Sequence, residues 1–157
     1  MSRKKSIIEP IPSPLKEVVK HSSLKVLLAE DNLSSKKVTL QILKKLGFRA
    51  DAVADGLEVL QSLERKHYDI ILMDVRMPDM NGLEATEIIR QRWPDKKPLI
   101  IAVTAYYQDV DREKCLKAGM DDYISKPIKL EDLKNMLHKY IPPQEWEKAS
   151  SKTRKKS

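Results

Sequence analysis

Five short apolar runs alternate with stretches of helical periodicity, and this alternation limits the fold more than any other feature of the sequence. The clearest run, residues 70–73, reads IILM and leads directly to a single acid, Asp74. The loop that follows contains Pro78 and closes with Asn81 and Gly82. An apolar run of this length between turn residues is typical of a buried parallel strand. Strands that alternate with helices predict βαβ crossovers, and therefore one parallel sheet with helices on both faces.

The sequence predicts five strands and five helices between residues 24 and 140. The second strand alternates apolar and polar residues and is predicted to lie at an edge, because central parallel strands are apolar throughout. The predicted strands are residues 25–29, 48–54, 69–73, 99–103 and 121–125. Candidate helix caps are Asn32 or Ser34, then Asp55 with Glu58 as a capping box, and the C-terminal glycines Gly47 and Gly119. The predicted buried stripes are Val38, Ile42 and Leu46 in the first helix, Leu57, Leu60 and Leu63 in the second, Ala85, Ile88 and Ile89 in the third, and Leu130, Leu133, Leu137 and Tyr140 in the last.

Length and charge set the expected domain organisation. The chain has 157 residues, about the size of one domain. Its net charge of +7 lies mostly in the tails, because residues 1–23 and 141–157 each hold five Lys or Arg against two Glu. We interpret residues 1–23 as a basic, Pro-rich linker or disordered arm, residues 24–141 as the folded domain, and residues 142–157 as a basic disordered tail. We expect no direct nucleic-acid binding, since the folded part is near neutral.

The sequence has no apolar run near the roughly 18 residues that a membrane span needs. The single cysteine, Cys115, cannot form an internal disulfide and is predicted to be a small buried or half-buried side chain. Both features favour a reducing, cytoplasmic setting.

Polar side chains follow four of the five predicted strands. Glu30 and Asp31 follow the first, Asp74 the third, Thr104 the fourth and Lys126 the fifth. Because the carboxyl ends of parallel strands lie along one edge of the sheet, we expect these five side chains to converge on a crevice there.

This set of side chains suits phosphoryl chemistry. Three crowded carboxylates repel each other, and a hard divalent cation, magnesium or manganese, removes that cost. One carboxylate, Asp74, can then attack a phosphoryl group and form an aspartyl phosphate. The Lys126 ammonium and the Thr104 hydroxyl would stabilise the phosphoryl oxygens, and the backbone N–H groups of Val75 and Ala105 are further candidate donors.

The pattern resembles the receiver domain of two-component response regulators over residues 24–140. Four strings carry the resemblance: VLLAEDN at 26–32, LMDVRMPDMNG at 72–82, IAVTA at 101–105 and AGMDDYISKP at 118–127. The resemblance implies a flavodoxin-like (βα)5 fold, a doubly wound parallel sheet with strand order 2-1-3-4-5. The first acid is Glu rather than Asp, a variant that is frequent in the receivers of hybrid histidine kinases.

The resemblance also implies roles for single residues. Asp74 would be the phosphorylated residue, with Thr104 and Lys126 holding the phosphoryl group, and the bond between Lys126 and Pro127 would be cis. Phosphorylation would draw Thr104 inward and let the switch residue Tyr123 follow. The implied metal ligands are Asp31, Asp74, the carbonyl of Arg76 and, through water, Glu30.

The implied partners are a histidine kinase or a histidine phosphotransfer protein, and a downstream protein that the sequence does not identify. The face that would change shape is formed by the last two helices and the fifth strand, and homodimerisation through this face is a further expectation. Arg76 and Tyr106 lie two residues past Asp74 and Thr104, where side chains influence the lifetime of the phosphate. A bulky Tyr106 predicts slow self-dephosphorylation.

Other functions fit less well. A phosphatase of the haloacid-dehalogenase type needs a second Asp where this chain has Arg76, and a nucleotide switch needs a Gly-rich loop that the four glycines do not form. A kinase or phosphotransfer protein needs a reactive His, whereas His21, His67 and His138 are interpreted as solvated or structural. The chain is not expected to turn over an external substrate. The remaining alternative is a degenerate receiver that acts as a docking module without phosphorylation.

Overall fold

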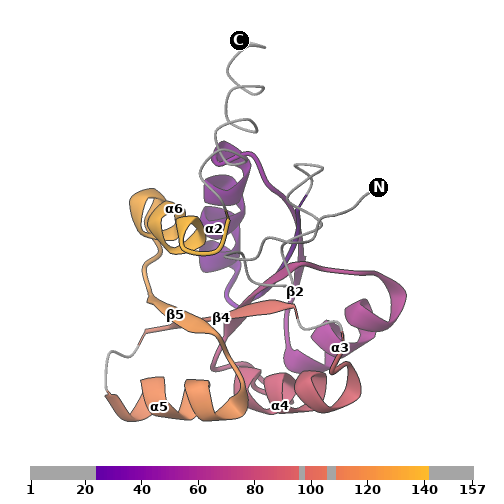
Figure 1. Ribbon diagram of the computed structural model, residues 1–157. Coiled ribbons are helices and arrows are strands. Elements are labelled where there is room, and N and C mark those ends of the chain that lie inside the picture. Colours follow the sequence, from indigo (N-terminus) through magenta and orange to yellow (C-terminus); the bar gives the residue numbers. More distant parts are fainter. Residues whose placement is uncertain (1–23, 96–97, 106–108, 142–157) are drawn as a thin grey trace, which may run out of the picture.

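The computed structural model describes residues 24–95, 98–105 and 109–141, with the backbone alone for 109–111. Strands and helices alternate along this part of the chain (Figure 1). The strands are β1 (Lys25–Ala29), β2 (Arg49–Val53), β3 (Ile70–Asp74), β4 (Leu99–Thr104) and β5 (Asp122–Ser125). The helices are α2 (Leu33–Lys45), α3 (Gly56–Arg65), α4 (Gly82–Arg92), α5 (Asp109–Ala118) and α6 (Leu130–His138).

All five strands are parallel and lie in the order β2-β1-β3-β4-β5. The chain moves outward from β1 to β2 and then crosses to β3 on the other side of β1. This reversal is the switch point at which open α/β sheets have their crevice, beyond the carboxyl ends of the strands. The predicted fold class and strand order are confirmed.

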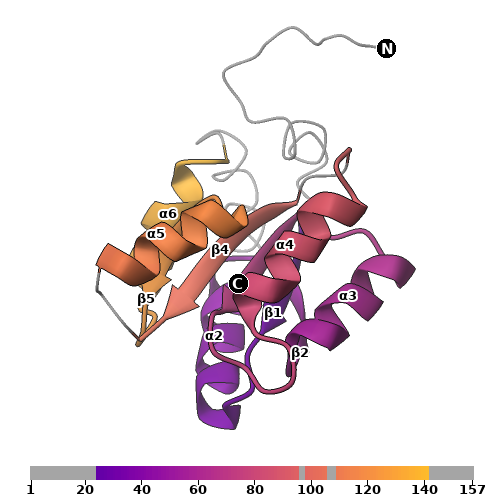
Figure 2. The same ribbon diagram turned by 90° about the horizontal axis from the view of Figure 1, so that it is seen from below.

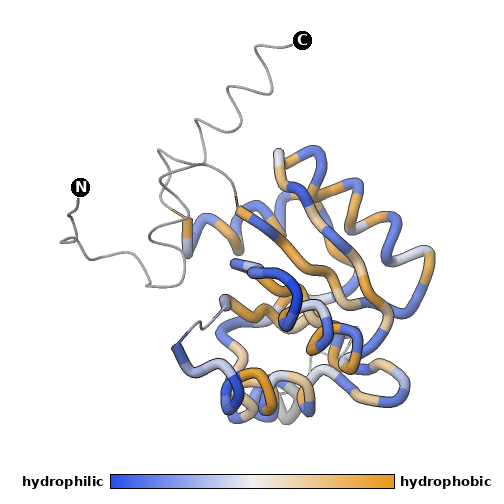
Figure 3. Tube along the Cα trace, turned by 90° about the vertical axis from the view of Figure 1, so that its right-hand side faces the viewer, coloured by the Kyte–Doolittle hydropathy of each residue, from blue (hydrophilic) through white to orange (hydrophobic). Residues whose placement is uncertain are grey.

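The sheet separates two layers of helices. Helices α2 and α6 cover one face, and α3, α4 and α5 lie side by side on the other (Figures 1 and 2). Strands β3 and β4 are buried along their whole length and β1 is buried after its first residue, whereas β2 is only partly buried. This difference confirms β2 as an edge strand. Figure 3 shows the apolar residues concentrated in the strands.

Two of the predicted helix stripes are wrong in one member. Val38 and Leu57 are each 48% exposed. In α2 the buried side chains are Thr39, Ile42 and Leu43, and in α3 Val59 and Leu60 are buried. Successive residues lie about 100° apart around a helix, so Val38 points partly away from the sheet although its neighbour Thr39 and Ile42, one turn later, are buried.

The helix caps follow the sequence closely. The Asn32 side chain accepts from the Ser35 N–H at 2.9 Å, and Asp55 accepts from the Glu58 N–H at 2.9 Å. The Glu58 carboxylate accepts from the Ala54 N–H, at 2.7 Å, instead of from Asp55 as a strict capping box would have it. Asn81 and Glu84 form a complete capping box at the start of α4, which fixes the loop after β3.

Cys115 is buried, as predicted. No helix in the described part of the chain is both long enough and apolar enough to cross a membrane.

Candidate functional site

Three carboxylates gather beyond the carboxyl ends of β1 and β3. Glu30 and Asp31 follow β1, and Asp74 is the last residue of β3. We call Glu30, Asp31 and Asp74 the acidic cluster. Each of them has a carboxylate oxygen within 4.8 Å of an oxygen of the other two. Glu30 and Asp74 are buried, at 2% and 5% exposure, while Asp31 is open to solvent. Two fixed carboxylates and one exposed carboxylate suit a hard divalent cation that keeps part of its water.

A lysine from the far side of the sheet reaches the acidic cluster. The Lys126 Nζ lies 2.8 Å from Glu30 Oε1 and 3.0 Å from Asp74 Oδ2. Lys126 follows β5, and its backbone N–H donates to the Thr104 carbonyl at 2.8 Å, which extends the β4–β5 pairing by one residue. The bond between Lys126 and Pro127 is cis.

Burial and charge shift the pKa values of this site in a consistent way. Burial raises the pKa of Asp74, and the nearby Glu30 adds to the rise, while hydrogen bonds from Lys126 and the Arg76 N–H oppose it. Burial alone would lower the pKa of Lys126, but the hydrogen bonds to Glu30 and Asp74 outweigh it and the pKa rises. One ammonium thus serves two buried carboxylates and leaves the acidic cluster with excess negative charge.

The acidic cluster opens into a cavity of about 560 Å³. Thr104, which is 3% exposed, lines it together with Ala105, Arg76 and Lys126. The five strand-end side chains predicted to converge therefore share one cavity. All of its lining residues are Glu30, Asp31, Asn32, Leu33, Ser34, Asp74, Arg76, Thr104, Ala105 and Lys126.

One expected donor is used elsewhere. The Val75 N–H donates to the Val103 carbonyl at 3.1 Å, so it belongs to the sheet and the expectation that it faces the site is wrong. The next residue, Arg76, instead donates its N–H to Asp74 Oδ1 at 3.0 Å. Sequence position does not show this difference, because it depends on where the β3–β4 pairing ends.

Tyr123 lies apart from the acidic cluster. It pairs with Ala102 in the β4–β5 register, is half-buried, and packs on the layer formed by α3, α4 and α5. The Arg112 guanidinium of α5 lies 5.3 Å from its ring centroid, within the range of a cation–π contact. Tyr106 lies outside the described residues.

Two residues of the site carry roles that the sequence analysis did not assign. The Asn32 N–H donates to Glu30 Oε2 at 3.1 Å and so helps to hold the buried carboxylate. A Cβ at Gly82 would come within 2.3 Å of the Asp74 carbonyl oxygen, so only glycine lets α4 start this close to β3. The Asn81-Gly82 pair was the signal available for this contact.

Residues 26–138 match the family model described as the response regulator receiver domain. Curated relatives include a probable histidine kinase 1 of Oryza sativa subsp. indica, 37% identical over 151 residues, and histidine protein kinase 1 of Candida albicans, 42% identical over 130 residues. The matches cover 76% of this chain but only 16% and 5% of those relatives. The chain thus spans less than a fifth of the length of either relative.

Solved structures agree with these relatives. The receiver domain of the sensor histidine kinase PA1611 from Pseudomonas aeruginosa, with a magnesium ion coordinated in its active site cleft, is 43% identical with a TM-score of 0.70. That match covers 76% of this chain and 98% of the other. The Saccharomyces cerevisiae response regulator Ssk1, whose receiver domain was solved with the phosphotransfer protein Ypd1, is 26% identical with a TM-score of 0.71. It covers 78% of this chain and 91% of the other.

Proposed function

Because this chain belongs to the response regulator receiver domain family, we propose that Asp74 accepts a phosphoryl group from a phosphohistidine of a histidine kinase or phosphotransfer protein. The observation that supports this most directly is the shared cavity. Glu30, Asp31, Asp74, Thr104 and Lys126 come from four strand ends and line one space of about 560 Å³. The relatives are histidine kinases, and one similar receiver was solved bound to a phosphotransfer protein.

The transfer forms one bond and breaks one. A carboxylate oxygen of Asp74 attacks phosphorus while the bond from phosphorus to the donor imidazole nitrogen breaks, and that nitrogen keeps the electron pair. Because the other ring nitrogen carries a proton, the donor is left as neutral histidine. Asp74 must be ionised to attack, and Lys126, 3.0 Å away, stabilises that form. Later attack by water on phosphorus would restore Asp74 and release phosphate, so no external substrate is turned over.

The acidic cluster fits Mg²⁺, or Mn²⁺ in its place. Asp31, Asp74 and the Arg76 carbonyl would hold the ion directly and Glu30 through water. A bound ion supplies positive charge that offsets the carboxylates and the transferred phosphoryl oxygens. The Lys126 ammonium and the buried Thr104 hydroxyl, which line the same cavity, would provide the remaining positive charge and hydrogen-bond donor for the phosphoryl oxygens.

Phosphorylation would act on partners through Thr104 and Tyr123. Movement of the Thr104 hydroxyl toward the phosphoryl oxygens would favour a second position of the Tyr123 ring and alter the face formed by α5, β5 and α6. The Arg112 guanidinium lies 5.3 Å from the Tyr123 ring centroid, so a second position of the ring would change this contact between α5 and β5. We propose this face as the site for the downstream partner or for a homodimer.

A different surface would receive the phosphoryl donor. Leu33 and Val38 of α2 are 71% and 48% exposed, beside the acidic cluster. Val38 also lines a small cavity of about 160 Å³ with Lys126 and Pro127. Exposed apolar side chains next to a reactive group suit a partner that must exclude water during transfer.

Mass spectrometry after incubation with acetyl phosphate and Mg²⁺ tests the phosphoacceptor. Wild type should gain one phosphoryl group, and Asp74→Asn should gain none. Asp79→Asn is the matched control, because it makes the same chemical change five residues away at an exposed position whose backbone φ of 63° suits Asn. Labelling of Asp79→Asn should equal that of wild type. Failure of wild type to label would favour the docking module.

Transfer kinetics test the donor surface. Val38→Lys should slow transfer from a phosphorylated phosphotransfer protein about tenfold, since a charge placed in an apolar contact loses its water when the partner binds. Labelling by acetyl phosphate should not change. Leu57→Lys on α3 is the control, because Leu57 is as exposed as Val38. Equal slowing by the control would contradict this surface.

The lifetime of the phosphate is proposed to depend on Arg76 and Tyr106. Arg76 is exposed and lines the cavity, where its side chain can restrict the approach of water. Loss of phosphate from Tyr106→Ala should be faster than from wild type in a chase after acetyl phosphate loading. We further propose a cytoplasmic setting and the domain limits 24–141, for a receiver that is part of a hybrid kinase or acts alone. Residues 1–23 are proposed as a basic, Pro-rich linker or disordered arm and residues 142–157 as a basic disordered tail.

A further inference from the structure

A second cavity, of about 570 Å³, lies at the amino end of the sheet, away from the acidic cluster. Four basic residues line it, and each comes from a different part of the chain: Lys25 from β1, Lys44 from α2, Arg49 from β2 and Lys66 from the end of α3. We call this cavity the basic groove. Its volume is within the range of about 300–1,000 Å³ that is usual for ligand pockets.

The positive charge of the basic groove is mostly uncompensated. Asp51 is its one acid, and Asp51 already accepts from Lys66 Nζ at 3.0 Å and from the Tyr68 hydroxyl. Among the described residues, Lys25, Lys44 and Arg49 have no side chain as ion-pair partner. Three exposed cations therefore face one cavity, which favours an anionic ligand.

The rest of the lining is apolar. Leu40, Phe48 and Ala50 are only partly buried, and Val26 and Tyr68 lie beneath them. A ligand that fills the basic groove should therefore carry apolar groups as well as negative charge. Amino acid side chains provide both within a few residues.

The edge of the sheet points to a peptide. Arg49 and Asp51 belong to β2, which has a neighbour strand on one side only. Backbone N–H and C=O groups on the open side of an edge strand can pair with an extended peptide. Nucleic acid needs a longer basic track, whereas residues 24–140 together are near neutral.

We propose that the basic groove binds an acidic peptide segment of a partner protein, with apolar side chains against Leu40 and Phe48 and carboxylates against Lys25, Lys44 and Arg49. This function is separate from phosphoryl transfer, because the acidic cluster lies at the opposite end of the strands. Binding should therefore be possible in both the phosphorylated and the unphosphorylated chain.

Fluorescence anisotropy with a labelled synthetic peptide tests the proposal. The probe has six Glu or Asp residues with one Phe and one Leu, and the full chain is titrated into it. Lys44→Glu combined with Arg49→Glu should weaken binding at least tenfold, or about 1.4 kcal/mol. The control, Lys114→Glu combined with Lys117→Glu on α5, makes the same charge change outside the basic groove and should bind within about twofold of wild type. Labelling by acetyl phosphate verifies that both variants fold.

A milder variant and salt give a second readout. Lys44→Gln combined with Arg49→Gln should also weaken binding of the peptide. The affinity of wild type for the peptide should fall steeply as the salt concentration rises. The proposal is overturned if wild type does not bind the peptide, or if both double Glu variants weaken it equally. It is also overturned if a single-stranded oligonucleotide, or a synthetic peptide of residues 1–23, binds in an Arg49-dependent way and displaces the acidic peptide at lower concentration.

Discussion

The two ends of the β-sheet differ in how their buried polar side chains are paired. At the carboxyl end, Glu30 and Asp74 are buried and share a single ammonium, that of Lys126. At the amino end, the buried or half-buried polar side chains of Asp69, Arg90 and Tyr140 each meet a partner within the chain, and the uncompensated cations of the basic groove are exposed. Polar groups that satisfy one another stabilise a fold, whereas an unbalanced buried charge indicates a ligand that completes it.

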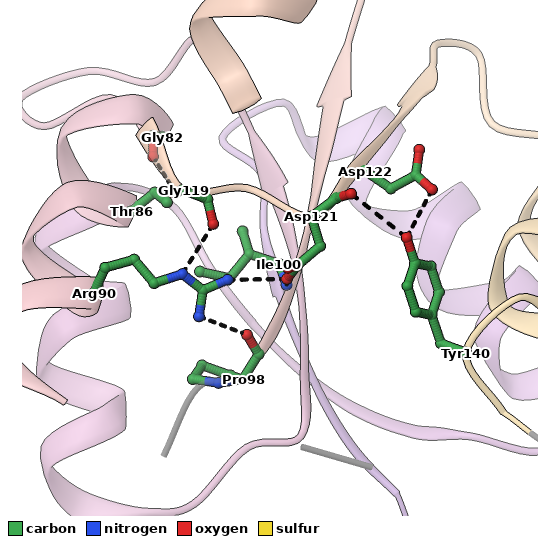
Figure 4. Close-up of polar contacts among 9 residues, drawn as sticks. All are labelled: Gly82, Thr86, Arg90, Pro98, Ile100, Gly119, Asp121, Asp122 and Tyr140. Carbon is green, nitrogen blue, oxygen red and sulfur yellow. Dashed lines mark hydrogen bonds and ion pairs between the residues drawn. The ribbon is translucent and has the colours of Figure 1, made fainter. Parts of the chain in front are cut away.

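Figure 4 shows the best example of balance at the amino end. Arg90 of α4 donates to the carbonyls of Gly119 and Pro98 and to the Asp121 carboxylate, each at 2.9 Å. The same Asp121 oxygen accepts from the Ile100 N–H at 2.8 Å. One guanidinium thus joins the start of β4 to the start of β5. A short distance away, the Tyr140 hydroxyl lies 2.9 Å from the Asp122 carboxylate.

Removing the hub of this network should have the largest effect on stability. Arg90→Ala leaves the Gly119 and Pro98 carbonyls without this donor and leaves the Asp121 carboxylate with the Ile100 N–H alone, and we expect a loss of about 2–3 kcal/mol in the free energy of unfolding. Arg92, on the same helix as Arg90, forms an exposed ion pair with Glu64 of α3. Arg92→Ala removes this pair and should lower the free energy of unfolding by less than about 1 kcal/mol. Urea denaturation measures both. Equal losses would mean that the Arg90 network contributes no more than a surface ion pair.

Arg90→Ala should leave labelling of Asp74 unchanged under conditions where the variant is folded. The two ends would then be separable, one for stability and one for chemistry. Loss of labelling in a folded Arg90→Ala chain would show that the amino end also positions the acidic cluster.

The next effect comes from the carboxyl end, where backbone contact is closest. An Ala at a helix position is normally more stable than Gly by up to about 1 kcal/mol. At Gly82 the added Cβ would meet the Asp74 carbonyl oxygen at 2.3 Å, and we expect this clash to dominate and to destabilise Gly82→Ala by about 1–3 kcal/mol. Thermal unfolding of Gly82→Ala and wild type shows whether the substitution raises or lowers stability. Gln91→Ala, an exposed change on the same helix, should stay within about 0.5 kcal/mol of wild type.

A smaller effect, with the opposite sign, is expected at Asp74. Its folded pKa is raised above the usual 3.8, chiefly by burial, so metal-free wild type loses stability as pH rises from 3.8 through the folded pKa. Asn has no proton to lose. At neutral pH Asp74→Asn should therefore be more stable than wild type, by up to about 1 kcal/mol, although Lys126 loses a charged acceptor.

Denaturation between pH 3 and pH 8 without divalent metal measures this difference, which should shrink as pH falls toward 3.8. Added Mg²⁺ should stabilise wild type more than the variant, because binding favours the folded, ionised form. A difference that does not change with pH would contradict the assignment to Asp74.

The sequence predicted the carboxyl end well for a physical reason. Strand ends are visible in the hydropathy pattern, and parallel strands bring their carboxyl ends to one edge, so residues such as Asp74 and Lys126 could be placed together although 52 positions separate them. The glycine and Asn-Gly signals likewise fixed the helix limits. These inferences use only local patterns and one topological rule.

The amino end could not be predicted in this way. Arg90 and Asp121 lie 31 positions apart on elements whose charged residues look like any solvated surface in the sequence. The position of Val38 depends on the rotation of α2 against the sheet, and the use of the Val75 N–H depends on where strand pairing ends. Packing and register decide these features, and neither leaves a local pattern.

The smallest effect belongs to Asp51, at the amino end. The Tyr68 hydroxyl, and then Lys66, lower the pKa of Asp51, so its contribution is present above pH 3.8 and is lost as pH falls through the folded pKa. Because half of the Asp51 side chain is exposed, we expect less than about 1 kcal/mol between wild type and Asp51→Asn at pH 7, and less again at pH 3.

Absorbance titration of Tyr68 distinguishes the effect of the Asp51 hydrogen bond on the pKa of Tyr68 from the effect of burial. Burial and then Asp51 raise the pKa of Tyr68 to about 12, so the stability it gives persists below pH 10 and is lost as pH rises through 12. Asp51→Asn should move the pKa of Tyr68 only part of the way back toward 10.0, because Tyr68 stays buried. The absorbance change that is lost in Tyr68→Phe is the one that belongs to Tyr68. An unchanged pKa in Asp51→Asn would mean that burial alone sets it, and that the amino end has one balanced pair fewer than the geometry indicates.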